Sequence, residues 1–562
     1  MSKYTIGIDY GTLSARALVV DISDGHELAS AVFEYPHAVM SETLPDGTLL
    51  GPDWALQHPQ DYLDALFAIV PAVVKNSKVL PEDIIGLGID FTSCTMLPVD
   101  KEATPLCFTD EFKNHPNAYV KLWKHHSTQK KADEIDRIAV ERKEKWHANY
   151  GGKVSSEWAL PKLWELLDED PALYSAMYEY VEAGDWLVWL LTGKDTRNSC
   201  SAGYKNFYNK RTGYPSHEFF KAIDPRLENV IEEKCFAPVI PIGKRAGRLK
   251  AELAEKLGLI PGTSVAAANI DAHVCVAGAG LTRPGQMLAI VGTSTCHMTV
   301  STVEKQVPGI CGVVEDGLLP GFLGYEAGQS CVGDIFAWFC GNCIPKAYEE
   351  AAKERGIGVQ QFLTELASSQ KPGESGLLAL DWFNGNRSVL VDFDLTGMVL
   401  GMTLQTKPEE IYRALIEATA YGTRMIVENF RKFGVDVNEF FATGGISQKN
   451  AMAMQIYADV LGAKYKIIKG NMVDYPQLER MDGYCDFNIH TIVVDEYKHP
   501  DQDATADIDA YKNKVLRHEL VHAFLRESGL CSNSWANNEE IVDWIAIQAP
   551  KIFEVFNKLD LL

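Results

Sequence analysis

The sequence has no long uninterrupted hydrophobic run. None of its apolar stretches approaches the roughly 18 residues that cross a membrane as a helix. The N-terminal stretch, Met-Ser-Lys-Tyr-Thr-Ile-Gly-Ile-Asp, also lacks the pattern of a secretory signal peptide. We therefore expect a cytoplasmic protein that does not have a membrane as a partner.

Basic residues are scarce relative to acidic ones. The chain has 53 Lys and Arg residues against 76 Asp and Glu residues, which gives a formal net charge of −23. Nucleic acids and anionic membrane surfaces carry dense negative charge, so neither is an expected partner. A disulfide framework is not indicated either, because the 12 cysteines are scattered and several lie inside apolar runs. That usage is typical of reduced thiols in the cytosol.

What the chain does have is length and an ordinary globular composition. Its 562 residues are 46% hydrophobic and 23% charged, enough for about two to four domains. Strand-like and helical stretches alternate in two successive sets, which predicts an α/β fold. The expected strands are Tyr4–Ile8, Ala15–Asp21, Ile84–Asp90, Ser264–Ile270, Met287–Val291 and Glu439–Thr443. The expected helices are Pro59–Lys75, Ser156–Leu167, Pro408–Lys432 and Gln448–Leu461.

Two segments far apart in the chain share one pattern, an apolar strand followed by a Gly-Thr turn with small hydroxyl residues. They are Ile6–Arg16 and Ile290–Cys296. Such a turn directs backbone N–H groups and hydroxyls into one concavity, which suits a phosphate chain. Asp9 adds a carboxylate that can hold Mg²⁺ directly or through water. The pair of turns predicts two related domains closing over one nucleotide, and hence phosphoryl transfer.

Transfer to a hydroxyl also needs a base and groups that orient the acceptor. Asp271 follows an apolar strand and suits a general base, but it equally suits a cap for the following helix. Lys205 and Glu326 could hydrogen-bond a polyol, although charged side chains of this kind are usually solvated at the surface. The Gly444-Gly445 turn could let adenosine approach the backbone, but it is also a common strand–helix connection.

Residues 3 to about 466 resemble the FGGY family of carbohydrate kinases. Seven motifs carry the resemblance, and together with the chain between them they span about four-fifths of the sequence. They are Gly7–Thr12, Asp90–Asp100, Val120–His126, Asn269–His273, Gly324–Ser330, Ala379–Arg387 and Gly401–Glu410.

The resemblance implies two actin/hexokinase-like ATPase domains around a cleft, at residues 1–270 and 271–466. It implies ATP-dependent phosphorylation of L-ribulose, or a close ketopentose, at the 5-hydroxyl, giving L-ribulose 5-phosphate and ADP in L-arabinose catabolism. The implied partners are the small-molecule sugar and ATP, with Mg²⁺ as cofactor. A homodimer is left open.

The resemblance also implies roles for individual residues. Asp271 would deprotonate the 5-hydroxyl, and Ser93, Lys205, Asp271 and Glu326 would line the sugar pocket. Ser93 stands where relatives often have alanine, which points to a contact through its backbone. Asp9 would help to hold Mg²⁺. The residues implied to contact the nucleotide are Gly11, Thr12, Gly292, Thr293, Ser294, Gly444, Gly445 and Asn450.

The resemblance to these kinases stops near Lys466. Relatives continue with a Ser/Thr-Pro-Ala-Leu-Gly-Ala-Ala turn and a long helix that complete the adenosine wall, and no Gly-Ala-Ala turn occurs downstream here. Residues 467–562 are instead markedly acidic, with two helical patterns at Tyr511–Ser528 and Asn537–Lys558. We therefore expect a truncated ATP-binding domain followed by a separate module.

That segment contains an HExxH motif, His518-Glu519-Leu520-Val521-His522. On a helix, His518 and His522 share a face and can bind one Zn²⁺, with Glu519 as general base for a bound water. Glu539 is the expected third ligand, with Glu540 as the alternative, and Asp543 could orient a ligating histidine. HExxH also arises by chance in purely structural helices.

The segment resembles small phage-type zinc metallopeptidase domains, in three stretches. They are Met481–Asp486, Arg517–His522 and Asn538–Ala546. The full expectation for the fold is thus α/β, with two ATPase domains and a small α+β zincin-like C-terminal module. Three hypotheses follow: a pentulose kinase, a zinc metallopeptidase-like protein whose kinase part is impaired, or a fusion in which neither part works fully.

Overall fold

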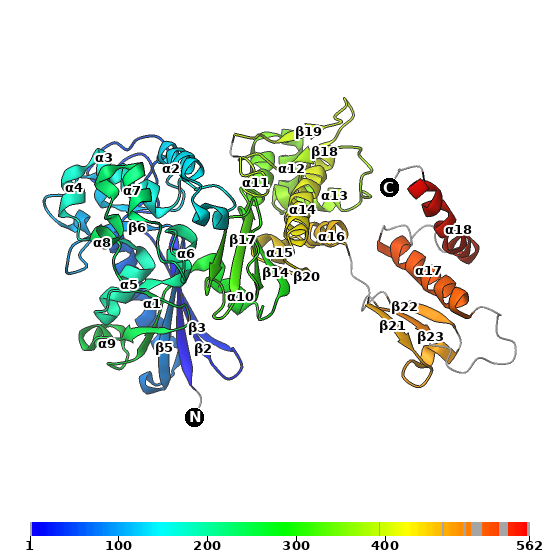
Figure 1. Cartoon of the computed structure of the whole chain (residues 1–562), viewed down its shortest axis with the longest axis horizontal. Coiled ribbons are helices and arrows are strands. Elements are labelled where there is room, and N and C mark those ends of the chain that lie inside the picture. The colour runs from blue at the N-terminus through cyan, green and yellow to red at the C-terminus, as the bar shows by residue number, and fades with distance from the viewer. Residues whose placement is uncertain are drawn as a thin grey trace. The chain divides into compact units, whose positions relative to one another are not determined.

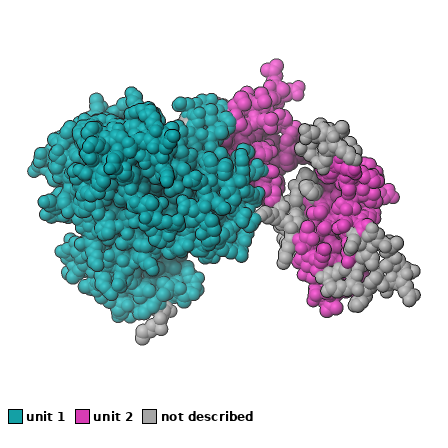
Figure 2. All heavy atoms as spheres, viewed as in Figure 1, with its two compact units in different colours: residues 1–334, 382–397, 425–445 teal, residues 335–381, 398–424, 446–562 magenta. Residues whose placement is uncertain are grey.

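The computed structural model describes residues 3–392, 394–462, 466–479, 481–486, 491–495, 508–527 and 538–558. The chain forms two compact units. Unit 1 contains residues 1–334, 382–397 and 425–445, and unit 2 contains residues 335–381, 398–424 and 446–562 (Figure 2). Among the described residues, no helix is both long and apolar enough to span a membrane.

The first sheet of unit 1 is built around a β-hairpin. Its central path runs β11-β12-β5-β1-β2-β3. The hairpin strands β1 and β2 are antiparallel, and β1 is parallel to β5. Figure 1 shows β2, β3 and β5 of this sheet in blue. The strands are β1 (Tyr4–Tyr10), β2 (Ser14–Asp21), β3 (Glu27–Glu34), β5 (Ile84–Phe91), β11 (Arg245–Arg248) and β12 (Ser264–Ala266).

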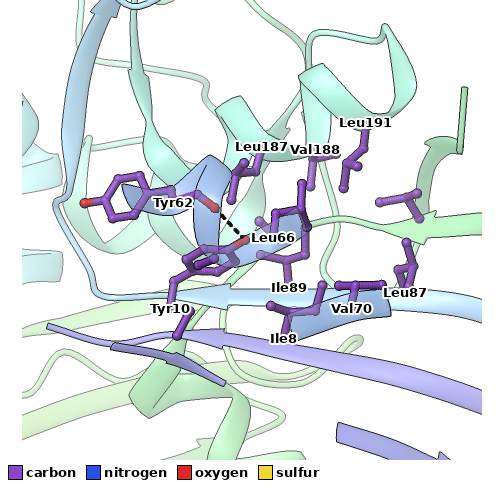
Figure 3. Packing of buried hydrophobic residues seen from close by; sticks show 14 of the residues in the cluster. Ile8, Tyr10, Tyr62, Leu66, Val70, Leu87, Ile89, Leu187, Val188 and Leu191 are labelled. Atoms are coloured by element: carbon purple, nitrogen blue, oxygen red, sulfur yellow. Dashed lines mark hydrogen bonds between the residues drawn. The ribbon is translucent and has the colours of Figure 1, made fainter. Parts of the chain in front are cut away.

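The core of this sheet lies between its alternating apolar residues and two helices, α1 (Pro59–Ser77) and α5 (Ala183–Thr192). Figure 3 shows Ile8 and Ile89 from the sheet packed against Leu66 of α1 and Leu187 of α5. The α1 helix begins at a proline, whose missing N–H costs nothing in the first turn. Burying this apolar face fixes β1 and β5, whose ends carry Asp9 and Asp90.

A second sheet in unit 1 repeats the plan of the first. Its order is β16-β17-β15-β14-β20, in which β14 and β15 form the hairpin and β14 is parallel to β20. The strands are β14 (Gly285–Val291), β15 (Thr295–Ser301), β16 (Gly312–Glu315), β17 (Leu323–Gln329) and β20 (Val437–Thr443). Each Gly-Thr turn therefore joins the two strands of a hairpin at the same place in its sheet.

The expected strand Ser264–Ile270 is not continuous. It divides into β12 and β13 (Asn269–Ile270), which both pair with β5. Val265 lies opposite Leu87 whereas Asn269 lies opposite Asp90, so one extra residue is accommodated between the two pairings. Irregularities of this kind redirect side chains near functional sites, and Asp271 follows directly. The expected helix Ser156–Leu167 also begins later, as α3 (Ala159–Glu169).

Other expected helices agree closely with the structure. The Pro408–Lys432 expectation matches α14, with those same bounds. The Gly444-Gly445 turn leads from β20 into α15 (Gly445–Lys449), and α16 (Ala451–Leu461) follows. The chain thus makes the strand–turn–helix connection that the sequence indicates.

The C-terminal residues of unit 2 form a small sheet and two helices. Strand β23 (Thr491–Asp495) is central, parallel to β21 (Lys466–Gly470) and antiparallel to β22 (Gly483–Asp486). Helix α17 (Ile508–Glu527) contacts β22, β23 and α18 (Glu539–Lys558). Both helices correspond to expected ones, whose end residues Ser528 and Asn537 lie outside the described residues.

Candidate active site

The first phosphate-type turn is held in shape by its own backbone and by two distant side chains. Gly11 donates its N–H to the Ser14 carbonyl oxygen over 3.0 Å. Gln57 Nε2 donates to the Thr12 carbonyl oxygen over 2.7 Å, and Trp123 Nε1 donates to the Thr12 hydroxyl over 3.2 Å. Because that hydroxyl already accepts one hydrogen bond, its proton is directed elsewhere, and a phosphate oxygen is a suitable acceptor.

The second turn closes in the same way. Gly292 donates its N–H to the Ser294 carbonyl oxygen over 3.0 Å. The residue before α11 (Gly333–Asn342) also fixes this turn, since Val332 N donates to the Thr293 carbonyl oxygen over 2.7 Å. Unit 1 therefore contains the two Gly-Thr turns that the sequence predicts, each closed by its glycine N–H, and the second loop is one residue shorter than the first.

Gly444 lies directly against the strand that enters the second turn. Its φ is +99°, and a Cβ atom there would stand 2.6 Å from the Val291 carbonyl oxygen. Only glycine tolerates both this conformation and this approach. The Gly444-Gly445 turn and the turn that starts at Gly292 are therefore neighbours, as the residues implied for the nucleotide require.

Carboxylates gather where β1 and β5 end. Asp9 lies opposite Asp90 in the parallel pairing of the two strands, and Asn269 lies opposite Asp90 on its other side. Burial and the charges of Asp9 and Asp271 raise the pKa of Asp90 to about 9. Asp90 begins the Asp90–Asp100 motif, and no function for it was expected from the sequence.

Asp271 is the first residue of α10 (Asp271–Gly278), and Ile270 occupies the N-cap position. The Asp271 carboxylate accepts a hydrogen bond from the adjacent Ala272 N–H over 2.6 Å, whereas a capping side chain usually bonds two or three residues ahead. Burial raises the pKa of Asp271 to about 7, and the charge of Asp9 adds to the effect. A carboxylate with this pKa suits a general base better than a cap.

Lys205 and Glu326 form a buried ion pair. Lys205 Nζ lies 3.0 Å from Glu326 Oε2, and both side chains are only 2% exposed. Burial favours the neutral forms of both side chains, but their charged partners have the larger effect. Glu326 raises the pKa of Lys205. Lys205, together with His273 and Arg387, holds the pKa of Glu326 well below its usual range. The alternative that these residues are solvated surface charges is wrong.

Two glycines explain how these charges come together. Lys205 ends α6 (Ser199–Lys205), and a Cβ at Gly203 would overlap the Val314 side chain of β16. On β17, a Cβ at Gly324 would stand 2.6 Å from the Tyr204 hydroxyl oxygen. The Gly-Tyr-Lys and Gly-Tyr-Glu segments thus interlock, because each glycine makes room for the other segment or its neighbouring strand.

Two further residues contact Glu326 and were assigned no function from the sequence. His273 Nε2 lies 3.2 Å from Glu326 Oε2, and Arg387 Nη2 lies 3.0 Å from Glu326 Oε1. Both belong to quoted family motifs, which is the only signal that could have indicated them. Their separation from Glu326 in the sequence gives no local pattern.

Ser93 and Asn450, which the family resemblance implies for the sugar pocket and the adenosine, have ordinary backbone and capping contacts. The Ser93 carbonyl oxygen accepts a hydrogen bond from the Thr95 hydroxyl over 3.3 Å, in a turn whose next residue, Cys94, has a φ of 54°. Asn450 belongs to unit 2, where its Oδ1 caps α16 by accepting from Ala453 N over 2.9 Å. Helix capping accounts for Asn450 without a nucleotide, and its implied adenosine contact stays a prediction.

The HExxH histidines and Glu539 converge in unit 2. His518 Nε2 lies 3.0 Å from His522 Nε2 and 3.1 Å from Glu539 Oε2, and His522 Nε2 lies 3.4 Å from the same oxygen. Nitrogen and oxygen atoms that bind one tetrahedral Zn²⁺ stand roughly 3.3 Å apart. The three residues expected as ligands are therefore placed together, with spacing that fits the ion.

Two more residues predicted around these histidines have defined environments. Asp543 Oδ1 lies 3.0 Å from His518 Nδ1, which orients that ring and leaves Nε2 toward Glu539. Glu519 packs near Gly483 of β22, and burial raises its pKa to about 6. Glu540, the alternative ligand, is not part of the convergent group.

Comparison with known proteins shows which protein family the chain belongs to. Unit 1 combines two hairpin-centred sheets with a buried carboxylate, Asp271, and a buried ion pair, Lys205–Glu326. The N-terminal and C-terminal domain models of the FGGY family of carbohydrate kinases match residues 4–278 and 287–472. The chain therefore belongs to the FGGY family of carbohydrate kinases.

Ribulokinases are among its close relatives. The chain is 54% identical over 466 residues to "Ribulokinase" of Geobacillus thermodenitrificans (strain NG80-2), covering 83% of this chain and 82% of that protein. It is 44% identical over 522 residues to "Ribulokinase" of Staphylococcus aureus (strain Newman), covering 92% and 94%. The second match necessarily runs past Lys466, into the segment expected to be a separate module.

Solved structures show the same fold at low sequence identity. A xylulose kinase from Rhodospirillum rubrum aligns with a TM-score of 0.66 at 22% identity, over 82% of this chain and 85% of that one. A Plasmodium falciparum glycerol kinase with ADP gives 0.64 at 16% identity, over 82% and 85%. All of these relatives are carbohydrate kinases, so the resemblance to metallopeptidases rests on the residues alone.

Proposed function

We propose that this protein catalyses ATP-dependent phosphorylation of L-ribulose at the 5-hydroxyl, giving L-ribulose 5-phosphate and ADP in L-arabinose catabolism. The observation that carries the proposal is the buried Lys205–Glu326 pair close to Asp271, whose pKa is raised to about 7. The high identity to ribulokinases over more than four-fifths of both chains supports this substrate. It favours the kinase over the alternative of a metallopeptidase-like protein with an impaired kinase part.

In the proposed reaction, the Asp271 carboxylate takes the proton of the 5-hydroxyl as its oxygen attacks the γ-phosphoryl group. Glu326, held ionised, accepts a hydrogen bond from a sugar hydroxyl, and Lys205 donates to a sugar oxygen. The Ser93 turn supplies backbone groups to the same pocket. Burial of these charges strengthens their interactions with the sugar, because little water competes.

The nucleotide side is assigned to the two turns and the Gly444-Gly445 turn. Gly11, Thr12 and residues 292–294 would contact the phosphates, and Gly444, Gly445 and Asn450 would lie near the adenosine. Mg²⁺ fits the site, because the Asp9 carboxylate at the end of β1 is the kind of oxygen ligand that this ion prefers. When bound, it would neutralise charge on the transferred phosphoryl group.

We propose the sequence-based domain limits as well: a sugar-binding domain at residues 1–270 and an ATP-binding domain at 271–466, followed by residues 467–562. Limited proteolysis with identification of the cut sites tests them. Cleavage concentrated near Lys466 would support the last boundary, and resistance there would count against it.

The kinase proposal is tested with purified protein, Mg²⁺-ATP and a set of sugars. ADP release should depend on L-ribulose, with weaker or absent responses to xyluloses and glycerol, and phosphorus NMR should show a primary phosphate ester at the 5-position. The absence of ribulose-dependent ADP, with folded protein, would refute the proposal. A KM for ATP far above that of an intact ribulokinase would support a truncated adenosine wall.

A second candidate function is metal binding by the C-terminal residues, favoured by one observation. The Nε2 atoms of His518 and His522 and Glu539 Oε2 converge within zinc-type spacing. We propose that these three hold Zn²⁺, with Glu519 beside them as general base if a substrate is hydrolysed. Elemental analysis of the purified full chain tests the site: one zinc per chain is expected, and protein that neither contains nor takes up zinc would refute it.

A further inference from the structure

Glu326 is surrounded by three nitrogen donors on three different elements. Lys205 Nζ and His273 Nε2 lie 3.0 and 3.2 Å from Oε2, and Arg387 Nη2 lies 3.0 Å from Oε1. A carboxylate accepts about four hydrogen bonds. The protein thus uses two acceptor directions of Oε2 and one of Oε1, which leaves one direction of Oε1 for a ligand.

Arg387 is the least obvious of the three donors, because it lies in a loop. That loop is fixed to β17 at the next residue, where the Ser388 hydroxyl accepts a hydrogen bond from Gly328 N over 3.2 Å. Gly328 also leaves space for the arginine, since a Cβ there would stand 3.3 Å from Arg387 Cδ. The consecutive loop residues Arg387 and Ser388 therefore both contact β17, at Glu326 and Gly328.

The contact is more than a surface ion pair. Glu326 is 2% exposed at its side chain and Arg387 is 22% exposed. Charge-assisted hydrogen bonds between such groups are about twice as strong as neutral ones, and arginine holds its donors in a fixed plane. Because Arg387 donates to Oε1, it can determine which acceptor direction of that oxygen remains available. Lys205 cannot do so, because it donates to the other oxygen, Oε2.

We propose that Arg387 is a positioning residue for sugar binding, which orients the Glu326 carboxylate so that its remaining Oε1 direction meets one hydroxyl of the acceptor sugar. It acts through Glu326 and does not touch the reacting 5-hydroxyl or the phosphates. The inference rests on the proposed kinase function. It assigns the site a preference for sugars that carry this hydroxyl over their deoxy analogues, because a deoxy sugar leaves the oriented carboxylate unpaired.

A double-mutant cycle tests the proposal, using R387Q, E326Q and the double variant in the full chain. R387Q should raise the KM for L-ribulose by about tenfold, the usual effect of losing a charge-assisted hydrogen bond, and should leave the KM for ATP and kcat within about twofold. In the E326Q background, R387Q should add almost nothing, because the residue through which Arg387 acts is already changed. R387K should recover part of the loss.

Melting temperatures and the exposed-arginine variant R137Q serve as controls, since among the described residues the ion pairs of Arg137 are with Glu134 and Glu141 of the same helix, α2 (Gln129–Arg142). A purely structural role for Arg387 would lower the melting temperature and the active fraction while both KM values stay unchanged, and would refute the inference. Additive effects of R387Q and E326Q on the KM for L-ribulose would refute it too. A wild-type protein that forms no ADP with L-ribulose would instead refute the proposed function, and the inference with it.

Discussion

Lys205 Nζ lies 3.0 Å from Glu326 Oε2 inside unit 1, although 121 residues separate them in the chain. Each charge stabilises the other there, and His273 and Arg387 add to the stabilisation of Glu326, since an unpaired charge in a buried site is strongly disfavoured. The pair consequently ties α6 to β17 while it shapes the proposed sugar pocket. Stability and substrate binding therefore depend on the same two side chains.

The first prediction concerns the loss of one partner of this pair. Lys205→Met should lower the free energy of unfolding by about 3–5 kcal/mol, because Glu326 is left buried with less compensation. Denaturant titration followed by fluorescence measures the change. Lys205→Met combined with Glu326→Gln should be less destabilised than Lys205→Met alone, and an equal or larger loss in the double variant would contradict the argument.

The second prediction concerns the proposed base. Asp271→Asn should reduce kcat for L-ribulose by about 10² to 10⁴, the range that general-base catalysis contributes. A coupled assay of ADP release measures it. Asp110→Asn is a matched control, because Asp110 is exposed and its ion pair in the described part of the chain is with Lys113. Wild-type turnover by Asp271→Asn would remove Asp271 from its proposed role.

The third prediction follows from the raised pKa of Asp271, about 7 against an ordinary value of 3.8. The base must be unprotonated, so kcat/KM should rise with pH through about 7 and level off above it. Folding has the opposite dependence: between pH 3.8 and about 7 the folded state binds more protons at Asp271 than the unfolded state does, so this residue's contribution to stability falls as pH rises.

Asp271→Asn removes that dependence. Its melting temperature relative to the wild type should therefore increase more at pH 8 than at pH 5, while its activity is lost at both. Scanning calorimetry at the two pH values measures the difference. A variant that is equally affected at both pH values would indicate that Asp271 ionises as an ordinary exposed aspartate.

The fourth prediction concerns the turn beside the second phosphate-type loop. Gly444→Ala places a methyl group 2.6 Å from the Val291 carbonyl oxygen at a φ of +99°, so the turn must shift. The KM for ATP should rise at least several-fold, with a smaller change for L-ribulose. Gly341→Ala is the control, because a Cβ at Gly341 meets no atom within 4 Å. Unaltered ATP kinetics in Gly444→Ala would place the nucleotide elsewhere.

The fifth prediction concerns the proposed zinc site. Asp543→Asn should weaken zinc affinity by about 10- to 100-fold, because such carboxylates orient ligating histidines without binding the metal themselves. Competition with a chromogenic chelator measures the affinity. Asp474→Asn, in an exposed turn of the same segment, should not change it, and an equal loss in both variants would indicate a general effect on folding.

Local patterns in the sequence predicted much of the fold and the existence of the two Gly-Thr turns that are proposed to contact the nucleotide. Apolar alternation indicated β1, β2 and β5, and glycine with hydroxyl residues indicated both turns, because these features depend on neighbours in the chain. The position of Asp271 after a strand indicated two possible roles for it, a general base or a helix cap. The break between β12 and β13 was not predicted, since it depends on pairing with β5, a partner distant in the sequence.

The environment of the proposed sugar pocket could not be predicted from local patterns. Lys205 and Glu326 individually look like surface residues, and it is contacts between residues distant in the sequence that make their burial tolerable. His273 and Arg387 have no local signal, because each depends on reaching Glu326 from another element. The metal-type cluster was predictable in part: helical spacing unites His518 and His522, but the approach of Glu539 requires α18 to pack on α17.

The backbone closure of the two turns has a consequence for the thermodynamics of nucleotide binding. Gly11 and Gly292 each donate to a carbonyl oxygen within their own turn, so the hairpins themselves determine the loop shape. Few backbone torsions then remain to be ordered when phosphates bind, and little conformational entropy is lost. ATP affinity should therefore respond strongly to charge and contacts, and only weakly to substitutions that merely stiffen the chain around these turns.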